Sequence, residues 1–136
     1  MLKVRDLKVA DLVMVVYDGN EKVGEVINVD HDDHKACVLT GEQEFWYDEE
    51  HLRPIPLNEA QLFKLGFTKH ANEDGTIKYM KGAFRVLLHR ENDFSNFEMW
   101  YREDLRQIRQ PIYVHDFQNK YLEMTKVHLT KGEFIA

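Results

Sequence analysis

Two prolines, Pro54 and Pro56, stand close together within residues 52–57 and restrict the possible folds of this chain. Each proline lacks a backbone donor and pushes the residue before it out of the helical region. The segment must therefore be extended, and it fits an edge strand or a barrel-closing strand better than a central strand. We interpret it as the seam between a first module, residues 1–57, and a second module, residues 58–136.

A short helix is predicted directly after the seam. Asn58 stands at the N-cap position, and Gln61 three residues later completes a capping box. Gly66 stands where a helix ends in a left-handed conformation, and Phe67 can pack back on Leu62, as in a Schellman ending. A helix of two turns is marginal alone in water, so we expect it to dock on a sheet.

The first module reads as short strands joined by tight turns. Strands are predicted at residues 11–17, 22–29, 35–40, 43–47 and 52–55. Gly24 is interpreted as a bulge or a site of close backbone approach. Five strands in this arrangement predict a small antiparallel barrel of SH3-like type, because closure removes exposed edges. The alternative is a simple meander in which the first and last strands do not pair.

The sequence of the second module predicts a sheet covered by a helix. Together with the strands of the first module, this makes the predicted fold class α+β, mostly β. Alternating apolar residues predict strands at 68–71, 76–80, 84–89 and 97–101, a three- or four-stranded meander. Pro111 can begin a last helix at about residues 112–124, which should cover this meander. The tail from residue 127 is expected to add an edge strand or to be frayed.

Charge is unevenly divided between the modules. Residues 1–57 hold six Lys/Arg and thirteen Asp/Glu, a net charge of −7, whereas residues 58–136 hold twelve and eleven, a net charge of +1. An acidic first module disfavours non-specific binding to DNA phosphates. No apolar run has the length of a membrane span or signal peptide, so a cytoplasmic protein is predicted.

Two features bear on metal binding and catalysis. Cys37 is the only cysteine, which excludes an internal disulfide, and its strand context predicts a buried, unreactive thiol. The loop that contains Asp30, His31, Asp33 and His34 could offer ligands to a divalent cation, but it lacks EF-hand spacing, and we favour a solvated turn. No nucleophile elbow, phosphate loop or paired-carboxylate motif is present, so we predict neither an enzyme nor a cofactor.

Aromatic residues suggest a protein-binding patch on the first module. Tyr17, Trp46 and Tyr47 are predicted to lie near acidic residues 49 and 50, a combination that small barrels use for binding. Strand alternation places Phe45 and Tyr47 opposite to Trp46, so at least one aromatic ring should lie outside the barrel. The alternative is that Trp46 and one neighbour simply fill the barrel.

A second candidate surface mixes an aromatic ring with guanidinium groups, as single-stranded nucleic-acid surfaces do. Its residues are Trp100, Arg102, Arg106 and Arg109. Acidic residues at 98, 103 and 104 interrupt it, and we favour the alternative that these residues form ion pairs on a sheet edge.

Residues 7–13 (LKVADLV), 52–67 and 112–121 (IYVHDFQNKY) together carry a resemblance. They resemble small uncharacterised proteins of gut anaerobes (Bacteroidales) and their phages or mobile elements, over most of the chain. The resemblance implies an intracellular accessory protein and no particular activity.

We predict an interaction module that binds an unknown protein partner or itself. The alternatives are a nucleic-acid-associated accessory protein and an acidic phage protein that mimics nucleic-acid charge. The mimic would use Asp30, Asp32, Asp33, Asp48, Glu49 and Glu50.

Overall fold

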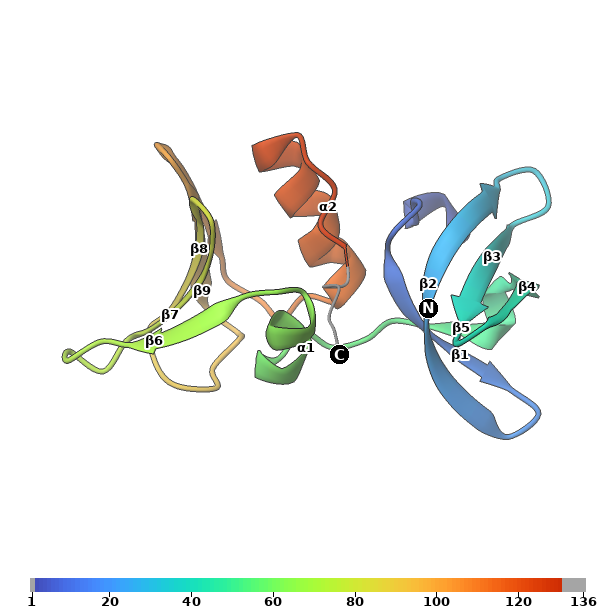
Figure 1. Ribbon diagram of the computed structural model, residues 1–136, viewed down its shortest axis with the longest axis horizontal. Coiled ribbons are helices and arrows are strands. Elements are labelled where there is room, and N and C mark those ends of the chain that lie inside the picture. The colour runs from blue at the N-terminus through green and yellow to red at the C-terminus, as the bar shows by residue number, and fades with distance from the viewer. Residues whose placement is uncertain (1, 131–136) are drawn as a thin grey trace. The chain divides into compact units, whose positions relative to one another are not determined.

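The computed structural model describes residues 2–130, which form two antiparallel five-stranded sheets and two α-helices (Figure 1). The α+β, mostly β class predicted from the sequence is confirmed. The chain divides into two compact units. The first unit holds the residues up to Ile55 together with Tyr113–Gln118, and the second holds Pro56–Ile112 together with the residues from Asn119.

The first unit contains a sheet with the strand order β4-β3-β2-β1-β5. Its strands are β1 (Leu12–Tyr17), β2 (Asn20–Asp30), β3 (Lys35–Thr40), β4 (Gln43–Asp48) and β5 (Leu52–Arg53). All neighbours are antiparallel, and β5 pairs with β1 through Val15 opposite Leu52. The first and last strands thus pair, contrary to the alternative of a simple meander. The order nevertheless leaves β4 and β5 as edge strands, so the hydrogen-bonded sheet is open and the predicted barrel closure is not shown.

Two glycines shape the long strand β2. Asp18 and Gly19 both have positive φ, 54° and 80°, and form the two-residue turn from β1 to β2. Gly24 approaches β3 closely, because a Cβ at this position would lie 2.9 Å from the Leu39 carbonyl oxygen and against the side chain of Val38. The close approach is as predicted, whereas the register irregularity lies further on, between Val26 and Asn28.

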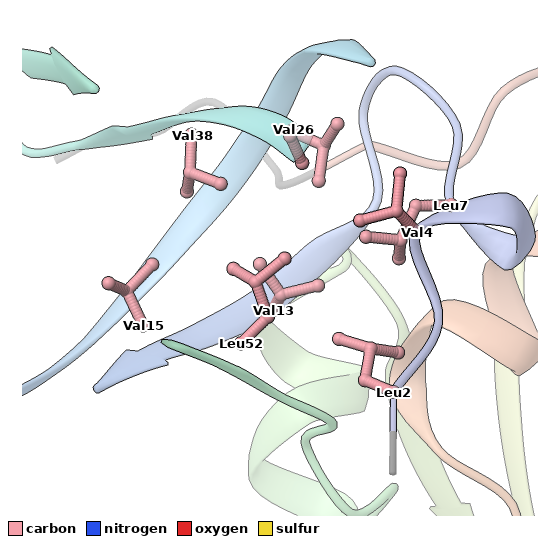
Figure 2. Close-up of a cluster of buried hydrophobic side chains, with 9 residues drawn as sticks. Leu2, Val4, Leu7, Val13, Val15, Val26, Val38 and Leu52 are labelled. Atoms are coloured by element: carbon pink, nitrogen blue, oxygen red, sulfur yellow. The ribbon is translucent and has the colours of Figure 1, made fainter. Parts of the chain in front are cut away.

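The core of the first unit lies on one face of this sheet. Strand alternation brings valines of three strands onto that face. The N-terminal segment, which contains the 3₁₀-helix η1 (Val4–Asp6), adds apolar side chains to it. Figure 2 shows these side chains pointing toward one another. The buried cluster consists of Leu2, Val4, Leu7, Val13, Val15, Val26, Ala36, Val38 and Leu52.

Helix α1 (Glu59–Lys64) opens the second unit and has the predicted ends. The Asn58 side chain accepts a hydrogen bond from the Gln61 backbone N–H at 3.0 Å. Gly66 has a φ of 94°, and the Phe67 N–H donates to the Leu62 carbonyl at 3.0 Å, which closes a Schellman motif. The predicted N-cap and Schellman ending are therefore confirmed. The reciprocal half of the predicted capping box is not formed, because the buried Gln61 Oε1 has no hydrogen-bond partner among the described residues.

The second sheet has the order β10-β9-β8-β7-β6. Its strands are β6 (Thr68–Ala71), β7 (Ile77–Lys81), β8 (Phe84–Leu88), β9 (Phe97–Tyr101) and β10 (Asp104–Ile108). The meander was predicted to have three or four strands. This was wrong, because the sheet has a fifth strand, β10. Arg102 turns the chain with a φ of 57°, a conformation that glycine or asparagine usually signals, so the sequence did not reveal this hairpin.

Helix α2 (Val114–Thr125) was predicted to cover the meander, and this holds only for its second half. In the second unit, the Tyr121 ring lies 4.6 Å from that of Phe84 on β8. Residues Tyr113–Gln118 instead belong to the first unit. There Gln118 accepts a bond from the Leu12 N–H and donates one to the Ala10 carbonyl, both at 2.8 Å.

Two further expectations concern the termini and membranes. Residues 127–130 form no strand, and the rest of the predicted tail lies outside the described residues. Neither described helix is long and apolar enough to cross a membrane.

Candidate functional site

A surface hollow of about 560 Å³ in the first unit is the strongest candidate site. It opens between the end of β1, the strand β4 and the 3₁₀-helix η2 (Glu49–His51) that follows β4. Tyr17, Phe45, Tyr47 and His51 supply four rings to it, and we call these four residues the aromatic cluster. The other lining residues are Val15, Asp18, Asn20, Lys22, Thr40, Gln43, Trp46 and Asp48.

The rings of the aromatic cluster contact one another, Tyr17–Tyr47 and Phe45–Tyr47 edge to face and Tyr17–His51 in a tilted arrangement. The Tyr17 ring centroid lies 6.2 Å from that of Tyr47 and 5.0 Å from that of His51, and Phe45 lies 6.4 Å from Tyr47. These separations and steep interplanar angles are those of favourable aromatic pairs. The rings therefore support each other's positions, and Tyr17 and Phe45 remain more than half exposed.

Strand alternation explains how the cluster forms. Phe45 and Tyr47 lie opposite Val38 and Ala36 on β3, so they share the core face of the sheet. Tyr47 packs against the edge of the buried cluster, but Phe45 is 53% exposed. The core is thus continuous with an aromatic surface that is about half exposed among the described residues.

His51 is held in place by the backbone. Its Nδ1 lies 3.1 Å from the carbonyl oxygen of Val16, which can only accept. In the neutral imidazole the proton is therefore on Nδ1, and Nε2 is left as an acceptor. Sequence reasoning missed His51, since a histidine in a polar turn 34 residues from Tyr17 carries no signal of this contact.

Sequence reasoning found part of this site. The hollow brings together Tyr17, Trp46 and Tyr47 from the predicted patch. It also adds Phe45, which alternation had placed beside Tyr47 without a role. Trp46 is 48% exposed and lies opposite Cys37, on the other face of β4 from Tyr47. Trp46 therefore does not fill a barrel interior.

The charged side chains around the hollow are mostly acidic. Asp18 and Asp48 line it, and Lys22 is the cation among its lining residues. Asp48 approaches Lys35 at 3.8 Å, with both side chains about half exposed, so this ion pair is weak. The neighbouring Glu49 is used structurally, because its carboxylate accepts the Val4 N–H at 2.7 Å.

The structure does not gather the second predicted surface on one face. Trp100 donates to Glu98 and lies under the Arg85 guanidinium at 5.6 Å, and Arg109 lines a polar hollow of about 500 Å³ that also includes Glu98. Arg106 instead pairs with Glu123 of α2 at 2.9 Å. Arg102 lies in the β9–β10 turn, over the ring of Tyr101.

The loop considered as a weak candidate for metal binding is a hydrogen-bonded turn. The Asp30 carboxylate accepts the backbone N–H groups of Asp32 and Asp33, both at 3.1 Å, and His31 and His34 are exposed. Within residues 2–130, no three His, Cys, Asp or Glu side chains are grouped so that they could hold a metal ion.

A buried polar cluster lies in the first unit near the end of the N-terminal segment. Asp11 is fully buried, and its carboxylate accepts from the Lys8 backbone N–H at 3.0 Å and pairs with the Lys8 ammonium. Burial raises the pKa of Asp11, and Lys8 and, more weakly, His115 oppose this rise. His115 is itself buried, and its Nδ1 has no hydrogen-bond partner among the described residues. The cluster is closed to solvent, since Asp11 and His115 are both buried.

Comparison with known proteins gave no relative. No family model, no curated protein and no solved structure matches this chain.

Proposed function

We propose that the first unit is an SH3-like barrel and acts as a protein-interaction module, with the hollow around the aromatic cluster as its binding site. The observation that carries this proposal is the exposure of Tyr17 and Phe45, 57% and 53%, side by side with Tyr47 in one hollow. Aromatic side chains grouped on a surface in this way are a common mark of an interaction site.

Two features support the SH3-like description. The strand order β4-β3-β2-β1-β5 brings the last strand beside the first, and the short helix η2 separates β4 from β5. Small barrels of this kind bind extended peptides in grooves lined by aromatic side chains. The hollow has the size and the lining for such a segment.

The biological setting we propose is that of an accessory protein, as the resemblance to proteins of gut anaerobes and their phages implies. A protein partner is preferred to nucleic acid because Trp100, Arg102, Arg106 and Arg109 are spread over different faces and partners. The residues that line the hollow, in contrast, lie together around one surface depression.

Affinity capture from cells that naturally produce the chain tests this proposal. The full chain, a Tyr17→Ala/Phe45→Ala variant and a Phe63→Ala variant are used as baits, each with and without nuclease. We expect one protein, or a second copy of this chain, to be recovered by the wild type and lost from the double variant. Both substituted residues are half exposed, so the variant should keep its fold.

Phe63 is the matched control, because it is an aromatic residue of the second unit with 47% exposure. Its replacement should leave recovery unchanged. Recovery that depends on nucleic acid, or that survives the double substitution, would contradict the proposal.

A further inference from the structure

We infer that the hollow recognises a positively charged side chain, arginine or lysine, presented by an extended segment of the partner protein. This inference rests on the proposed function and adds the chemistry of the ligand. It follows from the rings, the charges and the hydrogen-bond acceptors that line the hollow.

The rings offer faces to a cation. Tyr17 and Phe45 are each more than half exposed, and Tyr47 lies between them with edge-to-face contacts to both. The face of an aromatic ring is electronegative and attracts an ammonium or guanidinium group. The apolar stem of a lysine or arginine can lie along the same rings while its charged end stays near water.

The carboxylates supply the charge complementarity. Asp18 and Asp48 line the hollow at its β1–β2 turn and at the end of β4, against the single cation Lys22. Among residues 2–130, the Asp48 side chain makes the long contact to Lys35 and does not cap the helix η2. A cationic ligand can therefore exchange for Lys35 at little cost.

The remaining polar groups include acceptors for N–H donors. His51 presents Nε2 because its Nδ1 is bonded to the Val16 carbonyl. Thr40 and Gln43 line the same hollow and can accept as well. A guanidinium group carries five donors in a plane, and it can stack on a ring while it donates to such acceptors.

The charge of the surrounding module acts in the same direction. Residues 1–57 have a net charge of −7, and an acidic surface speeds the approach of a basic partner and repels an acidic one. The hollow therefore combines short-range cation recognition with long-range steering.

Selection from a random peptide library displayed on phage tests the inference with the full-length chain as the target. The Tyr17→Ala/Phe45→Ala variant serves as the counter-target. We expect the wild type to enrich peptides that share one Arg or Lys position. Replacing that residue by citrulline or norleucine should weaken binding about tenfold, measured by fluorescence polarisation.

Two charge substitutions separate recognition from folding. Asp18→Asn keeps a residue that tolerates the left-handed turn conformation, and Asp48→Asn removes only an exposed ion pair. The double variant should bind the selected peptides about tenfold more weakly, with a reduced dependence on salt. The Phe63→Ala variant should bind as the wild type does.

The possible outcomes distinguish a failure of the proposed binding site from a failure of cation recognition at that site. If the wild type enriches no peptide over the counter-target, the proposed binding site is wrong. If it enriches peptides without a shared basic position, or if citrulline and the Asp→Asn variants leave affinity unchanged, the site stands and cation recognition is wrong. A consensus that retains only arginine, or only lysine, identifies the group that the hollow prefers.

Discussion

At the scale of single residues, Gly24 shows how closely the first sheet is packed. A Cβ at this position would lie 2.8 Å from the Thr40 Cγ2 and 2.9 Å from the Leu39 carbonyl oxygen. The second contact is with backbone, which cannot rotate away. A side chain at residue 24 could therefore be accommodated only if β2 moved away from β3.

We predict that Gly24→Ala lowers the free energy of unfolding by about 2–3 kcal/mol, because it overpacks this strand contact. Urea denaturation measures the change. Val23→Ala, at a neighbouring half-exposed position, is the control and should change stability by less than about 1 kcal/mol. Equal stabilities of the Gly24→Ala variant and the wild type would show that the strands are less close than described.

The buried carboxylate of Asp11 leads to a pH-dependent prediction. Because burial raises its pKa above the value in the unfolded chain, Asp11 favours the folded state at low pH. This advantage is lost as the pH rises through the folded pKa. Lys8 opposes the rise, so Lys8→Met should raise the pKa of Asp11 further. The variant should lose about 1–3 kcal/mol of stability at pH 7 and much less near pH 4.

Denaturant unfolding of the wild type and the variant at both pH values tests this prediction. Lys35→Met removes the partner of an exposed ion pair and serves as the control, with a change below about 0.5 kcal/mol. A loss from Lys8→Met that is the same at pH 4 and pH 7 would mean that Asp11 is not ionised against Lys8.

At the scale of elements, the first half of α2 is fixed to the start of β1 by one side chain. Gln118 is fully buried, and its amide group both accepts from Leu12 and donates to Ala10. We predict that Gln118→Leu costs about 2–4 kcal/mol, because two buried backbone groups lose a partner at once. Gln107→Leu, on exposed β10, should cost less than about 0.5 kcal/mol in the same thermal or urea unfolding assay. Similar losses in both variants would contradict this role.

Elements that depend on local sequence patterns could be predicted, and contacts between distant residues could not. Helix α1 was predictable because Asn58 and Gly66 encode its two ends within nine residues. Hairpin β1–β2 was predictable because Asp18 and Gly19 favour its turn. The contact of Gln118 with Ala10 depends on residues 108 positions apart, and no local pattern reports it.

The candidate site was only partly predictable for a related reason. Tyr17 and Tyr47 were chosen for their residue type, but their contact requires the pairings of β1 with β2, β2 with β3 and β3 with β4. His51 enters the site through the bond to Val16, which no spacing rule anticipates. Residue chemistry thus predicted two members of the aromatic cluster, Tyr17 and Tyr47, and sheet topology brought Phe45 and His51 to them.

At the scale of the whole molecule, the first unit is discontinuous in sequence, because it needs Tyr113–Gln118 as well as the residues up to Ile55. We predict that residues 1–57 produced alone are less stable than the same residues in the full chain. The fragment lacks Gln118, and it also lacks the bond that Val114 N–H donates to the Ile55 carbonyl at 2.8 Å.

Amide NMR spectra measure this difference. The fragment should show collapsed or exchange-broadened signals, and addition of a peptide covering residues 112–125 should restore dispersion. A well-dispersed fragment spectrum that the peptide leaves unchanged would contradict the prediction. The matched control is a peptide with Gln118→Leu, which should restore less.

The interrupted path of the chain through the first unit also sets an order of events during synthesis. A nascent chain leaves the ribosome with its N-terminus first, and domains generally fold as units once their residues have emerged. The strands up to Arg53 emerge first, yet the segment that completes their unit emerges only after Ile108 has finished the second sheet. A nascent chain stalled before Gln118 would therefore carry a finished second sheet behind an unfinished first one.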